Sequence, residues 1–225
     1  MFQIVVLEII RCRKDNGSKV VVWGRKVPNV LWQIYCSAAF LLLGMAFSQL
    51  STDIIKYMVG RLRPHFYTVC QPVFGNGMTC EKIDKNFHRY VEDYRCTGGT
   101  ERQLKEMRLS FPSGHSSFSM YTMLYFALYL QARWHSCSNT KILKHAVQFL
   151  AVLSSVAVAM SRISDYKHHW SDVLGGLTLG ATVAIITARC FSGIFDKTGR
   201  HQQQLEGSKI SAELTNLNLN NGNNV

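Results

Sequence analysis

Three clusters of charged and polar residues in this sequence could do chemistry, and the first runs from Lys56 to Pro64. Lys56 and Arg63 are seven residues apart, which is two helical turns, so we expect them to share a helix face, with Pro64 ending the regular run. An ammonium and a planar guanidinium together suit the oxygens of a phosphate dianion. Taken alone, however, this cluster is more typical of a basic flank that contacts lipid headgroups.

The second cluster, Phe111 to Ser117, opens a long uncharged stretch of the chain. Its serines are favoured at helix N-caps, Gly114 lets a ligand approach the backbone, and the free amides at a helix start bind anions. His115 would then stand in an anion site, where it could deliver a proton. A capped helix start with an incidental histidine is an equally good interpretation of this cluster when it is read alone.

The third cluster extends from Ser161 to Asp172. If His168 and Asp172 lie on one helix, their four-residue spacing places an imidazole beside a carboxylate, which can keep one ring nitrogen protonated and leave the other nucleophilic. Arg162 adds a third cation for a phosphate. A metal site made of His168, His169 and Asp172 is a weaker alternative, because adjacent histidines point to different helix faces and no Cys or Glu completes the set.

The elements that must position these clusters are four apolar segments. Two of them, of 26 and 24 uncharged residues, are long enough to cross the ~30 Å hydrocarbon layer as helices, and two of 16 residues reach that length if flanking residues such as Arg189 snorkel. Buried helices of a soluble bundle are disfavoured, because four such stretches would leave little of a 225-residue chain to face water. The sequence therefore predicts an all-α integral membrane helical bundle with four complete spans: Val27–Thr52, Leu109–Ala132, Ala146–Ser161 and Val173–Ala188.

Four spans place both chain ends on one side of the membrane. Six basic residues precede the first span, and the connection from Arg133 to Lys144 has three bases and no acid, so this side is predicted to be cytosolic. All three clusters then meet at the opposite, lumenal or extracellular surface. Three cations, two histidines and a carboxylate there describe a phosphoryl-transfer site in which cations replace a metal.

Composition is consistent with this arrangement. With 47% hydrophobic and 17% charged residues the chain is not intrinsically disordered as a whole, and its formal net charge of +11 suits nucleic acid, a membrane surface or a phosphorylated substrate. The long loop after the first span contains Cys70, Cys80 and Cys96, in a compartment where disulfides persist, and we favour a bridge between Cys80 and Cys96. After Gly199 the Gln- and Asn-rich chain is predicted to be disordered.

The three clusters together resemble the motifs of the type 2 phosphatidate phosphatase superfamily, K-x6-R-P, P-S-G-H and S-R-x5-H-x3-D. The surrounding strings, such as GRLRPHF and SRISDYKHHWSDV, resemble animal lipid phosphate phosphatases over about residues 1 to 195. The resemblance implies a six-span enzyme of the plasma membrane or an endomembrane. Its active site is expected to face the cell exterior or an organelle lumen. Its implied activity is removal of phosphate from phosphatidate, lysophosphatidate, sphingosine 1-phosphate and ceramide 1-phosphate through a phosphohistidine intermediate, without a metal ion or other cofactor.

The same resemblance assigns roles to individual residues. His168 is the implied nucleophile, Asp172 its partner and His115 the acid that protonates the leaving lipid oxygen. The implied phosphate-binding residues are Lys56, Arg63, Ser113, Gly114 and Arg162.

The domain organisation expected from this resemblance is a membrane-embedded phosphatase domain at residues 1–199, lacking the family's first helices, and a polar cytosolic tail at residues 200–225. A non-catalytic lipid-phosphate-binding or regulatory subunit of full-length relatives is the alternative function, and another phosphoryl-transfer enzyme of the superfamily is a third. No nucleic acid partner is expected. Homo-oligomers or hetero-oligomers with family members stay open.

Overall fold

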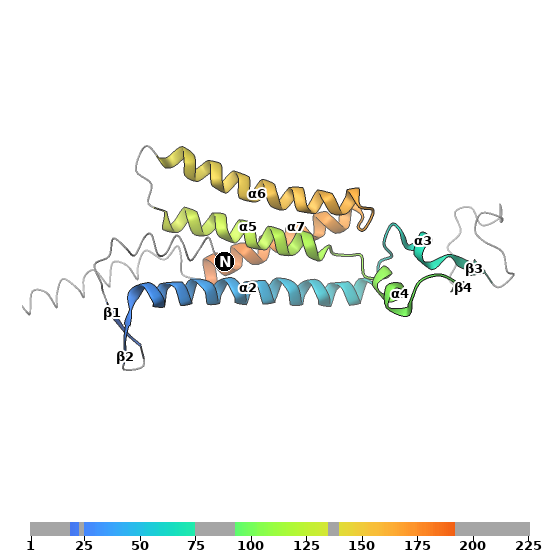
Figure 1. Ribbon diagram of the computed structural model, residues 1–225, viewed down its shortest axis with the longest axis horizontal. Coiled ribbons are helices and arrows are strands. Elements are labelled where there is room, and N and C mark those ends of the chain that lie inside the picture. Colours follow the sequence, from blue (N-terminus) through green and yellow to red (C-terminus); the bar gives the residue numbers. More distant parts are fainter. Residues whose placement is uncertain (1–18, 23–24, 75–92, 135–139, 192–225) are drawn as a thin grey trace, which may run out of the picture. The chain divides into compact units, whose positions relative to one another are not determined.

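The computed structural model describes residues 19–22, 25–74, 93–134 and 140–191 (Figure 1). The chain divides into two compact units, Met1–Ser192 and Gly193–Val225, and all of the described residues belong to the first. The predicted disordered tail and Cys80 lie outside the described residues.

Four long helices make up most of the described part of the chain. They are α2 (Asn29–Val59), α5 (Gly114–Arg133), α6 (Lys141–Ser164) and α7 (Trp170–Ile186), and a π-helical turn, η4 (Thr187–Phe191), continues α7. Figure 1 shows α5 between α2 and α6, and α5 also packs along α7. α2 ends where Gly60 adopts the left-handed conformation at φ 61° and donates its amide to the carbonyl oxygen of Lys56.

Three helices in the described ranges are long and apolar enough to cross a membrane: Leu31–Val59, Lys141–Ser164 and Trp170–Phe191. The prediction of an all-α membrane bundle is confirmed. The predicted count of four spans is not confirmed, because α5 is not among the three helices that are apolar enough to cross a membrane. α5 is less apolar because neighbouring helices cover its polar and aromatic side chains, and the buried ones include Ser116, Ser117, Tyr121, Tyr125 and Tyr129.

Small residues bring α7 close to the first turns of α5. A Cβ atom at Gly180 would collide with the carbonyl oxygen of Ser117, and one at Gly176 would collide with that of Ser113. This glycine pair, four residues apart, permits the close backbone approach that is common between helices in membranes. The start of α5, which carries the second cluster, is thereby fixed against α7.

Hydroxyl groups fix the other side of α5 to α2. The Ser48 Oγ lies 2.8 Å from the Ser117 Oγ, and Thr52 donates to the same Ser117 oxygen at 3.2 Å and to the carbonyl of Ser48 at 2.8 Å. All three side chains are buried, so these bonds satisfy polar groups that would otherwise be costly inside the bundle.

Short elements that the sequence did not predict lie outside the bundle. The described residues contain two antiparallel strand pairs, β1 (Lys19–Val22) with β2 (Arg25–Pro28), and β3 (Pro72–Phe74) with β4 (Tyr94–Cys96). Two short helices, α3 (Phe66–Cys70) and α4 (Glu101–Met107), follow the end of α2 and precede α5. Thr100 begins α4 with a capping box, in which its side chain and that of Gln103 bond to each other's backbone amides.

The predicted Cys80–Cys96 disulfide is wrong, because the bridge joins Cys70 to Cys96. β3 pairs with β4 so that Pro72 lies opposite Cys96, and this register brings the α-carbons of Cys70 and Cys96 to 4.7 Å. That distance is within the range that a disulfide requires. Only the strand pairing, which three cysteines in a sequence do not reveal, selects this partner.

Candidate active site

The three predicted clusters meet at one end of the helix bundle. The segment after α2, the segment before α5 and the connection from α6 to α7 are joined there by backbone hydrogen bonds. Ser110 N donates to Arg61 O at 3.0 Å, and Ser113 N donates to Asp172 O at 2.9 Å. The convergence expected from the order of the spans is therefore present in the described residues.

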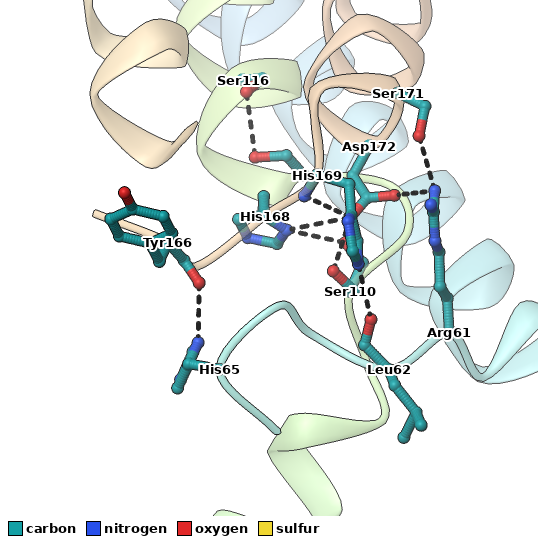
Figure 2. Close-up of polar contacts among 11 residues, drawn as sticks. Arg61, Leu62, His65, Ser110, Ser116, Tyr166, His168, His169, Ser171 and Asp172 are labelled. Atoms are coloured by element: carbon teal, nitrogen blue, oxygen red, sulfur yellow. Dashed lines mark hydrogen bonds and ion pairs between the residues drawn. The ribbon is translucent and has the colours of Figure 1, made fainter. Parts of the chain in front are cut away.

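The imidazole of His168 is almost completely buried, at 5% exposure, and its Nδ1 atom lies 2.8 Å from the carbonyl oxygen of Ser110 (Figure 2). Because a carbonyl oxygen can only accept, Nδ1 carries the proton and donates it, and Nε2 keeps a free lone pair. This is the tautomer that a nitrogen nucleophile needs.

The group that receives the Nδ1 proton of His168 is the Ser110 carbonyl and not, as the sequence suggested, the Asp172 carboxylate. The four-residue spacing would place His168 and Asp172 side by side only if both lay on one helix, but α7 begins at Trp170, two residues after the histidine. The Nδ1 of His168 is 3.9 Å from the Asp172 Oδ2, too far for a hydrogen bond, although close enough for an electrostatic interaction. The backbone of Ser110 therefore sets the proton position, and Asp172 contributes charge.

The surroundings of His168 keep its imidazole neutral. Burial is the largest cause and the positive charge of Arg63 is the next, and together they lower the pKa of His168 to about 4. The hydrogen bond to Ser110 and the charge of Asp172 act in the opposite direction without outweighing them. At neutral pH the Nε2 atom is consequently unprotonated.

Asp172 is fully buried in the first turn of α7 and accepts three hydrogen bonds. Its Oδ1 accepts from the Nη1 of Arg61 at 2.7 Å, and its Oδ2 accepts from the Ser110 Oγ at 2.6 Å and the His169 amide at 3.0 Å. A negative charge is also favoured at a helix N-terminus. The carboxylate is thus oriented, and both of its oxygens accept hydrogen bonds.

Arg61 and Ser110 were missed by the sequence analysis. Arg61 lies within the string GRLRPHF, two residues before Arg63, and Ser110 lies two residues before the P-S-G-H motif. Arg61 could have been noticed in the sequence because it stands close to Arg63, which matches the family motif. Nothing in the sequence indicates that Ser110 acts through its carbonyl oxygen.

The predicted phosphate-binding residues of the first two clusters lie together. A Cβ atom at Gly114 would be 3.2 Å from the Nζ of Lys56, so that ammonium lies against the start of α5. The Nε of Arg63 is buried and has no hydrogen-bond partner among the described residues. The first amides of α5, from Gly114 onward, have no acceptor within their own helix. An ammonium, an unsatisfied guanidinium donor and free amides provide a setting for an anion.

Ser113 occupies the N-cap of α5 without capping it through its side chain. Its buried hydroxyl oxygen accepts a hydrogen bond from the Ser116 Oγ at 2.9 Å, and its amide is used by Asp172. The structure therefore places Ser113 at the expected helix start, engaged mainly in supporting the loop.

His115 is exposed on the first turn of α5, and the described cations that act on it electrostatically are Arg162, Lys56, Lys167 and Arg63. Arg162 is itself engaged, since its Nη2 is 3.1 Å from the Asp165 Oδ2. Its carbonyl oxygen also accepts from the amide of His168 at 3.3 Å. Arg162 is thus near the site but shared with a carboxylate that the sequence analysis did not consider.

The alternative metal site does not fit this arrangement. Within the described ranges no three His, Cys, Asp or Glu residues converge as ligands. The Nδ1 of His168 is used by the Ser110 carbonyl, and the Nε2 of His169 lies 3.2 Å from the carbonyl oxygen of Leu62. The two histidine rings are thus held by separate backbone carbonyls.

Comparison with known families agrees with this geometry. The family described as the PAP2 superfamily matches residues 37–196, which include all three clusters. The chain belongs to the PAP2 superfamily. The resemblance drawn from the three motifs is therefore confirmed, and no solved structure matches the chain.

Named relatives come from animals. Mouse phospholipid phosphatase 1 is 46% identical over 173 residues, which cover 77% of this chain and 58% of that protein. Mouse phospholipid phosphatase 2 is 45% identical over 193 residues, covering 85% of this chain and 65% of that protein. A Drosophila melanogaster protein whose name includes the words phosphatidate phosphatase is 43% identical over 204 residues, 86% of this chain and 53% of its own length. The chain thus spans less than two thirds of the length of each.

The depressed pKa of His168 predicts that stability falls as the pH is lowered. The unfolded chain takes up this proton near the ordinary value of 6.5, whereas the folded protein takes it up only near 4, so protonation favours unfolding between these values. We expect the midpoint of thermal unfolding in detergent to drop across this window, by an amount equivalent to on the order of 1–3 kcal/mol. His168→Gln should show a smaller drop.

The matched control is His145→Gln, which replaces an exposed histidine of α6 and should leave the pH dependence as it is in the unmodified protein. An identical pH dependence in His168→Gln and the unmodified protein would contradict the assignment.

Proposed function

We propose that this chain is a lipid phosphate phosphatase. Its proposed substrates are the phosphate monoesters phosphatidate, lysophosphatidate, sphingosine 1-phosphate and ceramide 1-phosphate. The observation that carries the proposal is the buried, neutral His168, whose Nε2 accepts no hydrogen bond from the described residues and which lies near the cations of the first cluster and the start of α5. The names of the phospholipid phosphatase relatives, and the membrane-spanning character of the helices, support a lipid substrate.

In the proposed mechanism, the Nε2 of His168 attacks the phosphorus atom as the bond to the lipid oxygen breaks. His115 gives its proton to that leaving oxygen, so the dephosphorylated lipid departs as an alcohol. The phosphohistidine formed in this step is then attacked by water, whose proton returns to His115, and inorganic phosphate is released. His168 and His115 end in the protonation states in which they began.

Charge stabilisation during both steps comes from fixed groups of the chain. Lys56, Arg63, Arg162 and the amides of Gly114 and its neighbours face the phosphoryl oxygens, where negative charge is concentrated in the transition state. Ser113 supports this loop. Asp172 offsets the positive charge that the imidazole of His168 acquires when Nε2 forms its bond to phosphorus. These cations take the part that a metal ion has in other phosphoryl-transfer sites, so the activity is proposed to be metal-independent.

The site is proposed to face the cell exterior or an organelle lumen, in a multi-pass protein of the plasma membrane or an endomembrane. The basic connection between α5 and α6 favours the cytosol for the opposite end of the bundle. The Cys70–Cys96 bridge lies in the segment between α2 and α5, on the side of the site, and disulfides persist in oxidising compartments.

Phosphate release tests the proposed activity directly. Purified protein should release phosphate from mixed micelles that contain each of the four lipid phosphates, and should do so in excess EDTA, because no metal takes part in the proposed mechanism. His168→Ala should abolish release, whereas His145→Gln should retain it. Turnover that is lost in EDTA and restored by Mg²⁺ would refute metal independence, and lipid binding without turnover would support the non-catalytic alternative.

Covalent labelling separates the roles of the two histidines. With radiolabelled substrate and a rapid quench, we expect an acid-labile, base-stable label on His168 and none in His168→Ala. His115→Ala should reduce turnover of lipid substrates by roughly 10²- to 10⁴-fold, yet still be labelled by an aryl phosphate whose leaving group needs no proton. Label on Ser113 or Ser116 would contradict the mechanism.

Orientation can be tested with two epitope tags. A tag inserted between Cys70 and Arg95 should be accessible on intact cells or inside sealed microsomes, and a tag after Gly199 should require permeabilisation. Equal access to both tags would refute the proposed orientation.

A further inference from the structure

The carboxylate of Asp172 has no exposure to water, so its counter-charge must come from a nearby group of the protein. Arg61 supplies that charge. Among the described Lys and Arg side chains, Arg61 is the one that forms an ion pair with this carboxylate. Its Nη1 lies 2.7 Å from the Asp172 Oδ1. The same nitrogen donates to the Ser171 Oγ at 2.6 Å, which fixes the guanidinium against the first turn of α7.

Arg61 and His168 contact different oxygens of the carboxylate. Oδ1 accepts from Arg61, whereas Oδ2 is the oxygen nearest to His168, at 3.9 Å from Nδ1. Figure 2 shows Asp172 between the two side chains. Because the Nη1 of Arg61 is occupied by Asp172 and Ser171, this arginine differs from Arg63, whose buried Nε is unsatisfied.

Ser110 connects Arg61 to the nucleophile by a second path. Its amide donates to the carbonyl oxygen of Arg61 at 3.0 Å and its hydroxyl donates to the Asp172 Oδ2 at 2.6 Å. Its carbonyl oxygen accepts the Nδ1 proton of His168 at 2.8 Å. The residue that sets the histidine tautomer is therefore held by the backbone of Arg61 and by the carboxylate that Arg61 neutralises.

We propose that Arg61 is a positioning residue for phosphoryl transfer: it pairs with the buried Asp172 carboxylate and keeps it aimed, so that Asp172 and Ser110 hold His168 ready to attack. This proposal rests on the proposed role of His168 as the nucleophile. When the Nε2 of His168 bonds to phosphorus, the ring gains positive charge, and an ionised Asp172 offsets it. Without Arg61, the carboxylate loses its counter-charge and its orientation, and this stabilisation is lost.

Steady-state kinetics with a short-chain lysophosphatidate distinguishes positioning from phosphate binding. Arg61→Gln should lower kcat by roughly 30- to 1,000-fold and change KM less than about threefold, because the side chain acts through Asp172 and not on the substrate. Arg61→Lys, which keeps the charge but loses the planar guanidinium, should recover part of the loss. The matched control is Arg102→Gln, since the Arg102 side chain is 91% exposed in a surface ion pair, and it should leave both constants unchanged.

A double-mutant cycle with Asp172→Asn provides the decisive comparison. If Arg61 acts through Asp172, the double variant Arg61→Gln/Asp172→Asn should match Asp172→Asn within about threefold, because the second change removes nothing further. This variant also leaves no buried charge unpaired, so it should fold where Arg61→Gln alone is unstable, as thermal unfolding and gel filtration would show. A raised KM with unchanged kcat in Arg61→Gln, or losses that multiply in the double variant, would overturn the proposal.

Failure of the proposed function gives a different pattern. Full activity or labelling in His168→Ala would refute His168 as the nucleophile, while the cycle would still report whether Arg61 and Asp172 act together. If the unmodified protein releases no phosphate, thermal unfolding is compared for the four proteins of the cycle: the unmodified protein, Arg61→Gln, Asp172→Asn and the double variant. Strictly additive losses of stability in the two single variants would overturn the pairing of Arg61 with Asp172.

Discussion

The buried carboxylate of Asp172 is the constraint that organises this end of the molecule. An ionised group without access to water must find all of its partners within the protein. Its donors come from three separate segments: Arg61 follows α2, Ser110 precedes α5 and His169 is the N-cap of α7. Satisfying one carboxylate therefore ties together loops that are far apart in the sequence. The same ties determine where His168 lies and which of its nitrogens is protonated.

The bundle beneath the site is adapted to this requirement. Apolar helices gain little from packing against one another in a membrane, where lipid is as apolar as their side chains, so close backbone contact and buried hydrogen bonds carry more of the association. Gly176 and Gly180 provide the contact between α7 and α5, and Ser48, Thr52 and Ser117 provide the hydrogen bonds between α2 and α5. The polar groups of α5 are thus structural, and they explain why this helix is less apolar than its neighbours.

The sequence was sufficient to predict that the three clusters converge, because the order of apolar segments determines which loops share one end of a bundle. It was also sufficient to identify the family, because Lys56, Arg63, His115, His168 and Asp172 are recognised by residue type and spacing. It could not show that a backbone carbonyl orients His168. Every residue has a carbonyl group, so residue type does not indicate which of them accepts a hydrogen bond from the histidine. The Cys70–Cys96 bridge depends on the register of β3 and β4, and the role of Arg61 depends on the path of the chain after Gly60. Both are set by tertiary contacts that no local pattern encodes.

The hydrogen bond from His168 to the Ser110 carbonyl has a consequence for how the site tolerates genetic change. An acceptor supplied by the main chain is present whichever codon specifies position 110, so no single substitution there deletes it. Replacing the serine by any residue other than proline removes only the hydroxyl that donates to Asp172. The reactive tautomer of the histidine depends instead on residues that determine the path of the backbone. Gly176 is an example, because its lack of a side chain leaves room for the backbone of Ser113. Variation that inactivates such a site without touching a chemically reactive residue is therefore to be sought in the helix contacts below it.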